Sequence, residues 1–174
     1  MEQPNPFVQL LAPVPLGHLQ SGLQVLAAER YVAFGSRAWE LFRKLDELRA
    51  DRPVRIWIYA SDNPNQPLPL SATWTGVYVG HVTSRGGAHP QGMRYRPEST
   101  RRYEGDNSGE WAVFWHVTEL RELSAGEYLP IHAMTGLDKA SSYSQAFAPE
   151  GPILIEPAGG GIRNRSRAGS QRMG

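Results

Sequence analysis

The chain has 174 residues, with 18 lysine and arginine residues against 17 acidic residues and no cysteine. This length fits one domain with its own core, and the lack of cysteine excludes disulfides, thiolate metal sites and cysteine nucleophiles. No apolar run approaches the roughly 20 residues that span a bilayer. The N-terminal segment has no basic stretch followed by an apolar one, so we expect a cytoplasmic protein without a secretory signal or a membrane partner.

The formal net charge of +1 is unevenly distributed along the chain. Residues 157–174 contain four arginines and no acidic residue, so residues 1–156 carry 14 basic against 17 acidic residues, a charge of −3. The Gly-, Ser- and Arg-rich end has almost no apolar content and cannot bury enough surface to offset the entropy of the chain. We therefore predict one domain over residues 1–156 and a disordered tail over residues 157–174.

The first part of the chain predicts alternating strands and helices. Residues 1–16 mix proline with apolar residues and predict an extended lead-in with one short strand, followed by a short helix that ends near Ala28. Residues 30–34 are rich in β-formers and predict a second short strand. Residues 37–49 predict the clearest helix, because apolar residues recur at spacings of three and four and Ser36 can act as the N-cap.

The second part of the chain predicts mostly strands. Apolar and polar residues alternate over 54–59, and residues 73–82 predict a long strand in which Gly76 and Gly80 mark bulges or close approaches. Further segments are a proline-rich loop at 62–70, a long polar loop at 84–110, an aromatic-rich strand at 111–120, a short helix at 137–147 and a closing strand at 153–155. This order predicts an α+β fold, a mixed β-barrel of about five to seven strands with two or three packed helices.

Familiar catalytic and metal-binding motifs are missing from the sequence. There is no glycine-rich phosphate loop between a strand and a helix, and no GxSxG nucleophile elbow. The five histidines never fall at a spacing typical of metal ligands. We therefore expect neither a metal nor another cofactor. His116 lies inside the aromatic-rich strand, where a histidine more often has a structural role than that of a base or ligand.

Three segments together resemble the PUA-like superfamily, in particular its ASCH and EVE branches. The first is the helix–strand–helix stretch LQVLAAERYVAFGSRAWELF at 23–42, and the second is the strand end Ile-Tyr-Ala-Ser at 58–61 with the glycine-bearing strand 73–82. The third is the Trp-rich strand 111–120 with its trailing Glu-Leu-Arg-Glu-Leu. The resemblance covers about residues 20–156. It implies a PUA-like barrel whose ligand cleft lies near the first long helix and the adjoining strand ends.

The ASCH motif GxKxxExR is not preserved in this chain. Laid over it, the sequence has Ala28, Arg30, Ala33 and Gly35 where the family has Gly, Lys, Glu and Arg. The Lys and Glu are the working groups of the ASCH members that hydrolyse acetylated nucleosides, and alanine cannot transfer a proton. Shifting the register by two aligns Arg37 with the arginine but places Gly35 on the glutamate. The comparison with the motif therefore does not support this hydrolysis, and we lean against an enzyme.

The positions that match the PUA-like cleft predict a binding site for a planar ligand. They lie at the start of the 37–49 helix and at neighbouring strand ends, and they are Phe34, Gly35, Ser36, Arg37, Tyr59, Ser61, Thr73 and Trp74. Trp74 or Tyr59 could stack on a base, and backbone N–H groups near Ser36 suit an anion or a carbonyl. Ser61, Thr73 and Arg37 could read a polar edge or a phosphate. Strand tryptophans are also typical of a core.

The arginines of the 84–110 loop form a second candidate set. They are expected to lie over the phosphates of a bound nucleic acid, and they are Arg85, Arg94, Arg96, Arg101 and Arg102. The leading hypothesis is thus a non-enzymatic module that recognises RNA, DNA or a modified nucleotide, with the base held in the cleft. Two alternatives stay open. One is a protein-interaction subunit of the same fold, and the other is an ASCH-type nucleoside amidohydrolase that uses a relocated acid such as Glu40 with His116.

Overall fold

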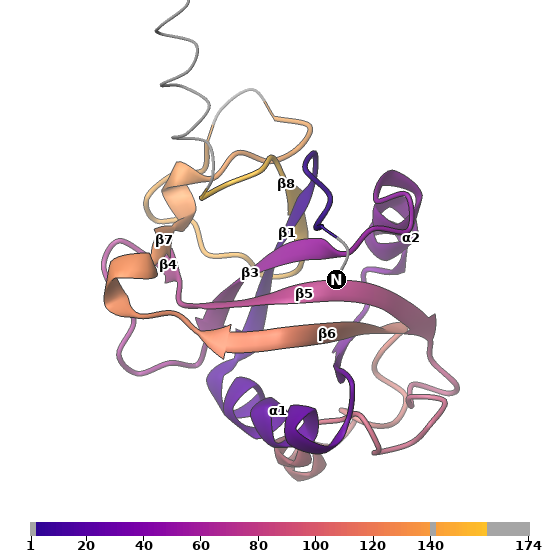
Figure 1. Ribbon diagram of the computed structural model, residues 1–174. Coiled ribbons are helices and arrows are strands. Elements are labelled where there is room, and N and C mark those ends of the chain that lie inside the picture. Colours follow the sequence, from indigo (N-terminus) through magenta and orange to yellow (C-terminus); the bar gives the residue numbers. More distant parts are fainter. Residues whose placement is uncertain (1–2, 140–141, 160–174) are drawn as a thin grey trace, which may run out of the picture.

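The computed structural model describes residues 3–139 and 142–159. Six strands form a sheet in the order β2-β6-β5-β3-β1-β8, and β4 and β7 form a second, two-stranded sheet. The large sheet curls into a half-barrel, with α1 and α2 at its margins (Figure 1). In chain order the elements are β1 (Gln9–Pro15), α1 (Leu16–Ala28), β2 (Val32–Ser36), α2 (Trp39–Leu48), β3 (Val54–Ser61), β4 (Ser71–Ala72), β5 (Trp74–Thr83), η1 (Glu98–Arg102), β6 (Val113–Glu122), η2 (Ala125–Glu127), β7 (Leu129–Pro130), η3 (Ile131–Ala133) and β8 (Ile153–Ile155).

The pairing of the large sheet is mixed. Strands β1 and β3 run parallel, whereas β1–β8, β3–β5, β5–β6 and β2–β6 are antiparallel. The α+β class and the strand number expected from the sequence are therefore confirmed, with the sheet as a half-barrel. None of the helices in the described parts of the chain is long and apolar enough to cross a membrane.

Two local predictions are wrong. The helix expected over 37–49 begins at Trp39, because Ser36 belongs to β2 and does not cap the helix; its Oγ instead accepts the backbone N–H of Ala38 at 3.1 Å. The helix expected over 137–147 is not formed in the part of that range that the structure describes, where turns and an isolated bridge occur instead. The sequence also predicts a disordered tail over residues 157–174. Residues 160–174 of this tail lie outside the described residues.

The two glycines of β5 mark irregular pairing, as their positions in the sequence predicted. The register between β5 and β6 shifts between Thr75 and Val77 and again between Tyr78 and Gly80. A Cβ added at Gly76 would lie 2.7 Å from a methyl group of Val117. Gly80 has a φ of +141°, which side chains rarely allow. Because bulges bend a strand and increase its twist, these glycines help the sheet to curl.

The main core lies on the concave face of the curled sheet. β3 alternates as its sequence predicts, so that Val54, Ile56 and Ile58 are fully buried on that face. The amphipathic helix α2 adds Phe42 and Leu45 to the same cluster. Burial of apolar surface contributes about 25 cal/mol per Å², so this continuous cluster holds the curl in place.

The convex face of the sheet is covered only in part. Residues 129–139 and 142–147 pack against β1 and β8 and bury a second core that includes Leu11, Ile131 and Ile155. At the other edge, the 84–110 loop shields β2, where the Ala33 N–H donates to the carbonyl of Tyr95 at 2.8 Å. Covered edges prevent a sheet from pairing with other chains. Between these two covers, the middle of β3, β5 and β6 faces outward.

Candidate functional site

A cleft of about 740 Å³ lies where the curled sheet brings the end of β2 toward the end of β1. These strands stand at opposite sides of the strand order, so the curl of the sheet creates the site. The 84–110 loop supplies one wall, and residues 150–152, just before β8, supply part of the rim. A volume of this size is typical of pockets that hold small molecules, which run from about 300 to 1,000 Å³.

Four of the eight predicted ligand residues line this cleft. They are Phe34, Gly35, Ser36 and Arg37. Ser36 is nearly buried, and its hydroxyl is occupied by the N–H of Ala38. Arg37 projects into solvent and its Nη2 lies 3.3 Å from a carboxylate oxygen of Glu110. The turn between β2 and α2 therefore contributes to the cleft mainly through Phe34 and through the exposed guanidinium of Arg37.

The other four predicted ligand residues lie outside the cleft lining. Trp74 is 2% exposed and packs in the main core, and Tyr59 packs against the second core. Thr73 is buried, and its hydroxyl has no hydrogen-bond partner among the described residues. Ser61 is the last residue of β3 and pairs with Pro15, and the next residue, Asp62, is the one that lines the cleft.

Aromatic rings that the sequence did not assign to the site form much of its walls. Trp111, Trp115 and Tyr103 line the cleft together with Phe34. The rings of Phe34 and Trp115, which face each other across β2 and β6, have centroids 5.2 Å apart. Trp111 lies directly against Gly35, so that any side chain at that glycine would overlap the indole. Pairing the 111–120 strand with β2 is the step that would have identified Trp111 and Trp115.

Arg96 ties the loop wall to the sheet. The residue is 4% exposed, and its guanidinium donates from Nη1 to the carbonyl of Ala33 (2.7 Å), from Nη2 to the carbonyl of Asp106 (2.9 Å) and from Nε to Oδ1 of Asn107 (2.8 Å). It also lies over the ring of Phe114. Burial lowers the pKa of Arg96 to about 10, so the group stays charged at neutral pH. Arg96 is thus a support of the loop, with part of its surface in the cleft.

The remaining loop arginines lie near the surface. Arg94 pairs with Glu29 at 3.2 Å, and Arg101 pairs with Glu98 at 2.9 Å. Arg85 and Arg102 are exposed. Arg102 directly precedes Tyr103 of the cleft wall, but neither Arg101 nor Arg102 belongs to the cleft lining.

His18 is the histidine of the cleft lining, and both of its ring nitrogens have partners. Its Nδ1 lies 2.6 Å from the hydroxyl of Ser99, and its Nε2 lies 3.4 Å from a carboxylate oxygen of Asp106. Burial lowers the pKa of His18, while Asp106 acts in the opposite direction. The Ser99 hydroxyl has one proton and two acceptors, Nδ1 of His18 at 2.6 Å and the carbonyl of Gly17 at 3.3 Å. With the proton on the shorter contact, the neutral ring of His18 can donate from Nε2 to Asp106. The histidine therefore bridges α1 to the loop.

A pair of buried histidines fixes the other end of the loop to β6. His89 Nδ1 accepts the backbone N–H of Gln91 at 3.0 Å, and His89 Nε2 lies 3.0 Å from Nε2 of His116. A ring that accepts at Nδ1 carries its proton on Nε2, so we assign His89 as the donor and His116 as the acceptor. Burial lowers the pKa of both histidines to about 4. Tyr31 stacks on His116 with ring centroids 4.0 Å apart.

The alternative acid–base pair from the sequence does not form in the cleft. Neither Glu40 nor His116 belongs to the cleft lining, and His116 is bonded to His89. Among residues 3–139 and 142–159, no three acidic or histidine side chains gather in a group that could hold a metal ion.

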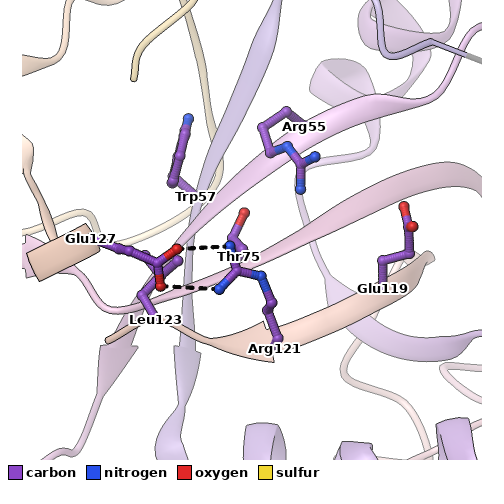
Figure 2. Close-up of a pocket in the computed structure, with 7 residues that line it drawn as sticks. All are labelled: Arg55, Trp57, Thr75, Glu119, Arg121, Leu123 and Glu127. Carbon is purple, nitrogen blue, oxygen red and sulfur yellow. Dashed lines mark hydrogen bonds and ion pairs between the residues drawn. The ribbon is translucent and has the colours of Figure 1, made fainter. Parts of the chain in front are cut away.

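A second depression lies on the uncovered convex face and holds about 410 Å³ (Figure 2). Its side chains come from β3, β5, β6 and η2, and the lining includes Arg55, Trp57, Glu119, Arg121 and Glu127. We call it the outer groove. Arg121 donates to both carboxylate oxygens of Glu127 at 3.1 Å, and these bonds hold the pKa of Glu127 at about 2. The formal charges of the two arginines and the two glutamates in the outer groove thus add up to zero.

Comparison of the chain with protein-family models, with curated proteins and with solved structures finds no match. The PUA-like resemblance therefore stays a prediction from the sequence pattern.

Proposed function

We propose that this protein is a recognition module that holds a nucleobase in the cleft between the ends of β1 and β2. The observation that carries the proposal is the cleft of about 740 Å³ with aromatic rings on its walls. Stacking of a base on an aromatic side chain contributes about 1–3 kcal/mol. Tyr103, which is 59% exposed, is the ring best placed to meet an incoming base.

The exposed arginines of the same loop support nucleic acid as the source of that base. Arg101 and Arg102 immediately precede Tyr103, and both are exposed. Arg85 lies in a turn whose Gly86 carbonyl accepts the N–H of Gly109, next to the cleft residue Glu110. A base in the cleft would leave its sugar and phosphate outside, on the side of these exposed loop arginines. The PUA-like resemblance points to the same class of ligand.

The sequence favours recognition over the hydrolysis catalysed by ASCH members. The Lys and Glu of the ASCH motif have no equivalent in this sequence, and the alanine at the position of the Glu cannot transfer a proton. The chemistry offered by the cleft is therefore stacking and hydrogen bonding.

The test is binding to single-stranded and duplex oligonucleotides over a series of salt concentrations. For single strands the logarithm of the binding constant falls with that of the salt concentration by about 0.7 per phosphate contact, so an Arg101→Ala/Arg102→Ala double variant should reduce the slope by about 1.4. Tyr103→Ala should weaken binding by about tenfold, since it removes a stacking surface. The matched control is Arg55→Ala/Arg121→Ala in the outer groove, which should bind like the parent protein.

Two outcomes would contradict the proposal. One is that no oligonucleotide or nucleoside binds, and the other is that binding is lost with the outer-groove variant and kept with Tyr103→Ala. The alternatives from the sequence are tested with the same preparation. Product analysis after incubation with acetylated nucleosides tests hydrolysis, and a stoichiometric protein that co-purifies without nucleic acid tests the interaction subunit.

A further inference from the structure

The lining of the cleft carries more negative than positive charge. Five carboxylates, those of Asp62, Glu104, Asp106, Glu110 and Glu150, stand against the two guanidinium groups of Arg37 and Arg96, a formal charge of −3 with His18 neutral. The outer groove of the same molecule has no such excess, because its two arginines match its two glutamates. The excess is thus a local property of the cleft.

The two positive groups of the cleft are already engaged. Arg37 is paired with Glu110, and the bonds of Arg96 go to two carbonyls and to Asn107. Asp106 faces His18, which is neutral at pH 7 because burial lowers its pKa. The charge of the cleft is therefore not cancelled from within.

Three rim carboxylates stay without an ionic partner. Asp62, Glu104 and Glu150 are exposed, and none of them forms an ion pair with any residue of the described chain. They come from three separate segments, the end of β3, the 84–110 loop and the turn before β8. Their convergence on one opening makes its potential negative from several sides.

The aromatic walls, like the rim carboxylates, favour a positively charged ligand. The face of an aromatic ring carries negative charge density, so a cation over a Trp, Tyr or Phe ring is attracted to it. Tyr103 and Trp111 are the less buried rings of the cleft, whereas Phe34 and Trp115 are nearly buried. A planar cation can thus combine stacking on a ring with attraction to the rim carboxylates.

We propose that the cleft selects a nucleobase that carries a positive charge on its ring at neutral pH, such as a purine methylated at a ring nitrogen. This inference rests on the proposed function, since it names the class of base that the same site holds. A phosphate group is repelled by the carboxylates and remains outside, near Arg101 and Arg102. The cleft therefore discriminates by the charge of the base, and the outer arginines contribute binding that does not depend on the base.

The experiment compares two isomers that differ in charge. 1-Methyladenosine is protonated and therefore cationic at neutral pH, whereas its isomer N6-methyladenosine is neutral. Titration of the full chain with each nucleoside gives two dissociation constants. We expect the cation to bind at least about tenfold more tightly, which is the factor that a cation–π contact with a partly desolvated ring provides. The preference should shrink as salt is added, because the rim charges are exposed.

Neutralising variants test the origin of the preference. Asp62→Asn, Glu104→Gln and Glu150→Gln each remove a charge from an exposed side chain, and asparagine tolerates the positive φ of 58° at position 62. The triple variant should reduce the preference to about twofold or less while the neutral isomer binds as before. The matched control is Glu119→Gln/Glu127→Gln in the outer groove, which should keep the preference unchanged. Thermal unfolding of every variant verifies that it is folded.

The outcomes distinguish this inference from the proposed function. Equal binding of the two isomers would overturn the preference for a charged base and would leave base recognition intact. Failure of both nucleosides and of every oligonucleotide to bind would overturn the proposed function as well. Tighter binding of a trimethyllysine peptide than of 1-methyladenosine would also overturn the inference, since the cleft would then recognise a protein cation.

Discussion

The cleft and the outer groove use similar residues on opposite faces of one sheet, yet they differ in volume and in charge. Both contain arginine, glutamate and tryptophan. In the groove, which holds about 410 Å³, two arginines match two glutamates, and Arg121 and Glu127 form an exposed ion pair (Figure 2). In the cleft, which holds about 740 Å³, the curl of the sheet, the loop and residues 150–152 bring aromatic rings together with an excess of carboxylates. Volume and unbalanced charge, more than residue type, thus distinguish the candidate binding site from the outer groove.

The largest expected difference between the two regions concerns their arginines. Arg96→Ala should lower the free energy of unfolding by about 3 kcal/mol or more, since it leaves buried carbonyls without their charged donor. Arg96→Lys should recover only part of this loss, because an ammonium group cannot reach three acceptors in a fork. Chemical denaturation measures both variants. A loss below about 1 kcal/mol for Arg96→Ala would mean that the loop wall does not depend on this residue.

Acid should weaken the loop wall through the buried histidine pair. His89 and His116 have pKa values of about 4 in the folded protein, below the ordinary value of 6.5. Between these pKa values the unfolded chain binds more protons than the folded protein. The free energy of unfolding is therefore highest above pH 6.5 and declines as the pH falls toward 4. A further proton cannot enter the His89–His116 bond without breaking it, and the charges of Arg96 and Arg30 oppose protonation as well.

The size of this acid effect is roughly 3 kcal/mol for each histidine. Urea unfolding at several pH values between 7 and 4 measures it, and His89→Gln/His116→Gln should flatten the curve while lowering stability at pH 7. His18, whose pKa is also lowered, keeps a smaller slope in the double variant. The same slope in the parent and the double variant would contradict the assigned pair.

A substitution at Gly35 should disturb the cleft more than the fold. Gly35→Ala places a methyl group into the indole of Trp111, so the ring has to move, at a cost of about 1–3 kcal/mol. Binding of a nucleoside should weaken by severalfold. Gly126→Ala is the matched control, because no atom lies within 4 Å of its added Cβ. Unchanged binding by Gly35→Ala would place the ligand away from Trp111.

The smallest effect is expected in the outer groove. Arg121→Ala breaks an exposed ion pair with Glu127, and such pairs contribute about 0–1 kcal/mol. Stability should therefore change little, and nucleoside binding should not change at all. Denaturation and titration of this variant complete the contrast with Arg96→Ala.

The strands and helices with strong periodicity could be predicted from the sequence. The alternation in β3, the apolar stripe of α2 and the irregularities at Gly76 and Gly80 follow from local patterns, which the structure confirms. The segment 137–147 could not be predicted in the same way, because it packs on the second core through Tyr143 and Phe147 without a helical repeat.

The candidate site was predictable only where it follows from local sequence. The 34–37 turn lines the cleft, as the resemblance implied. The role of Trp74 depends on which face of β5 is buried. Arginine is usually a surface residue, but the loop buries Arg96. The carboxylates of the rim come from three segments that meet only through the curl of the sheet, so no pattern along the chain joins them.

The most direct test of the cleft as a base-binding site is a titration with 1-methyladenosine followed through the indole N–H signals in NMR spectra. Trp111 and Trp115 line the cleft and Trp57 lines the outer groove, so the signals report on both faces at once. Trp57→Phe, Trp111→Phe and Trp115→Phe each assign one of these three signals. The account predicts that Trp111 and Trp115 shift to saturation while Trp57 stays in place. A shift of Trp57 alone, or no shift of any indole signal, would contradict it.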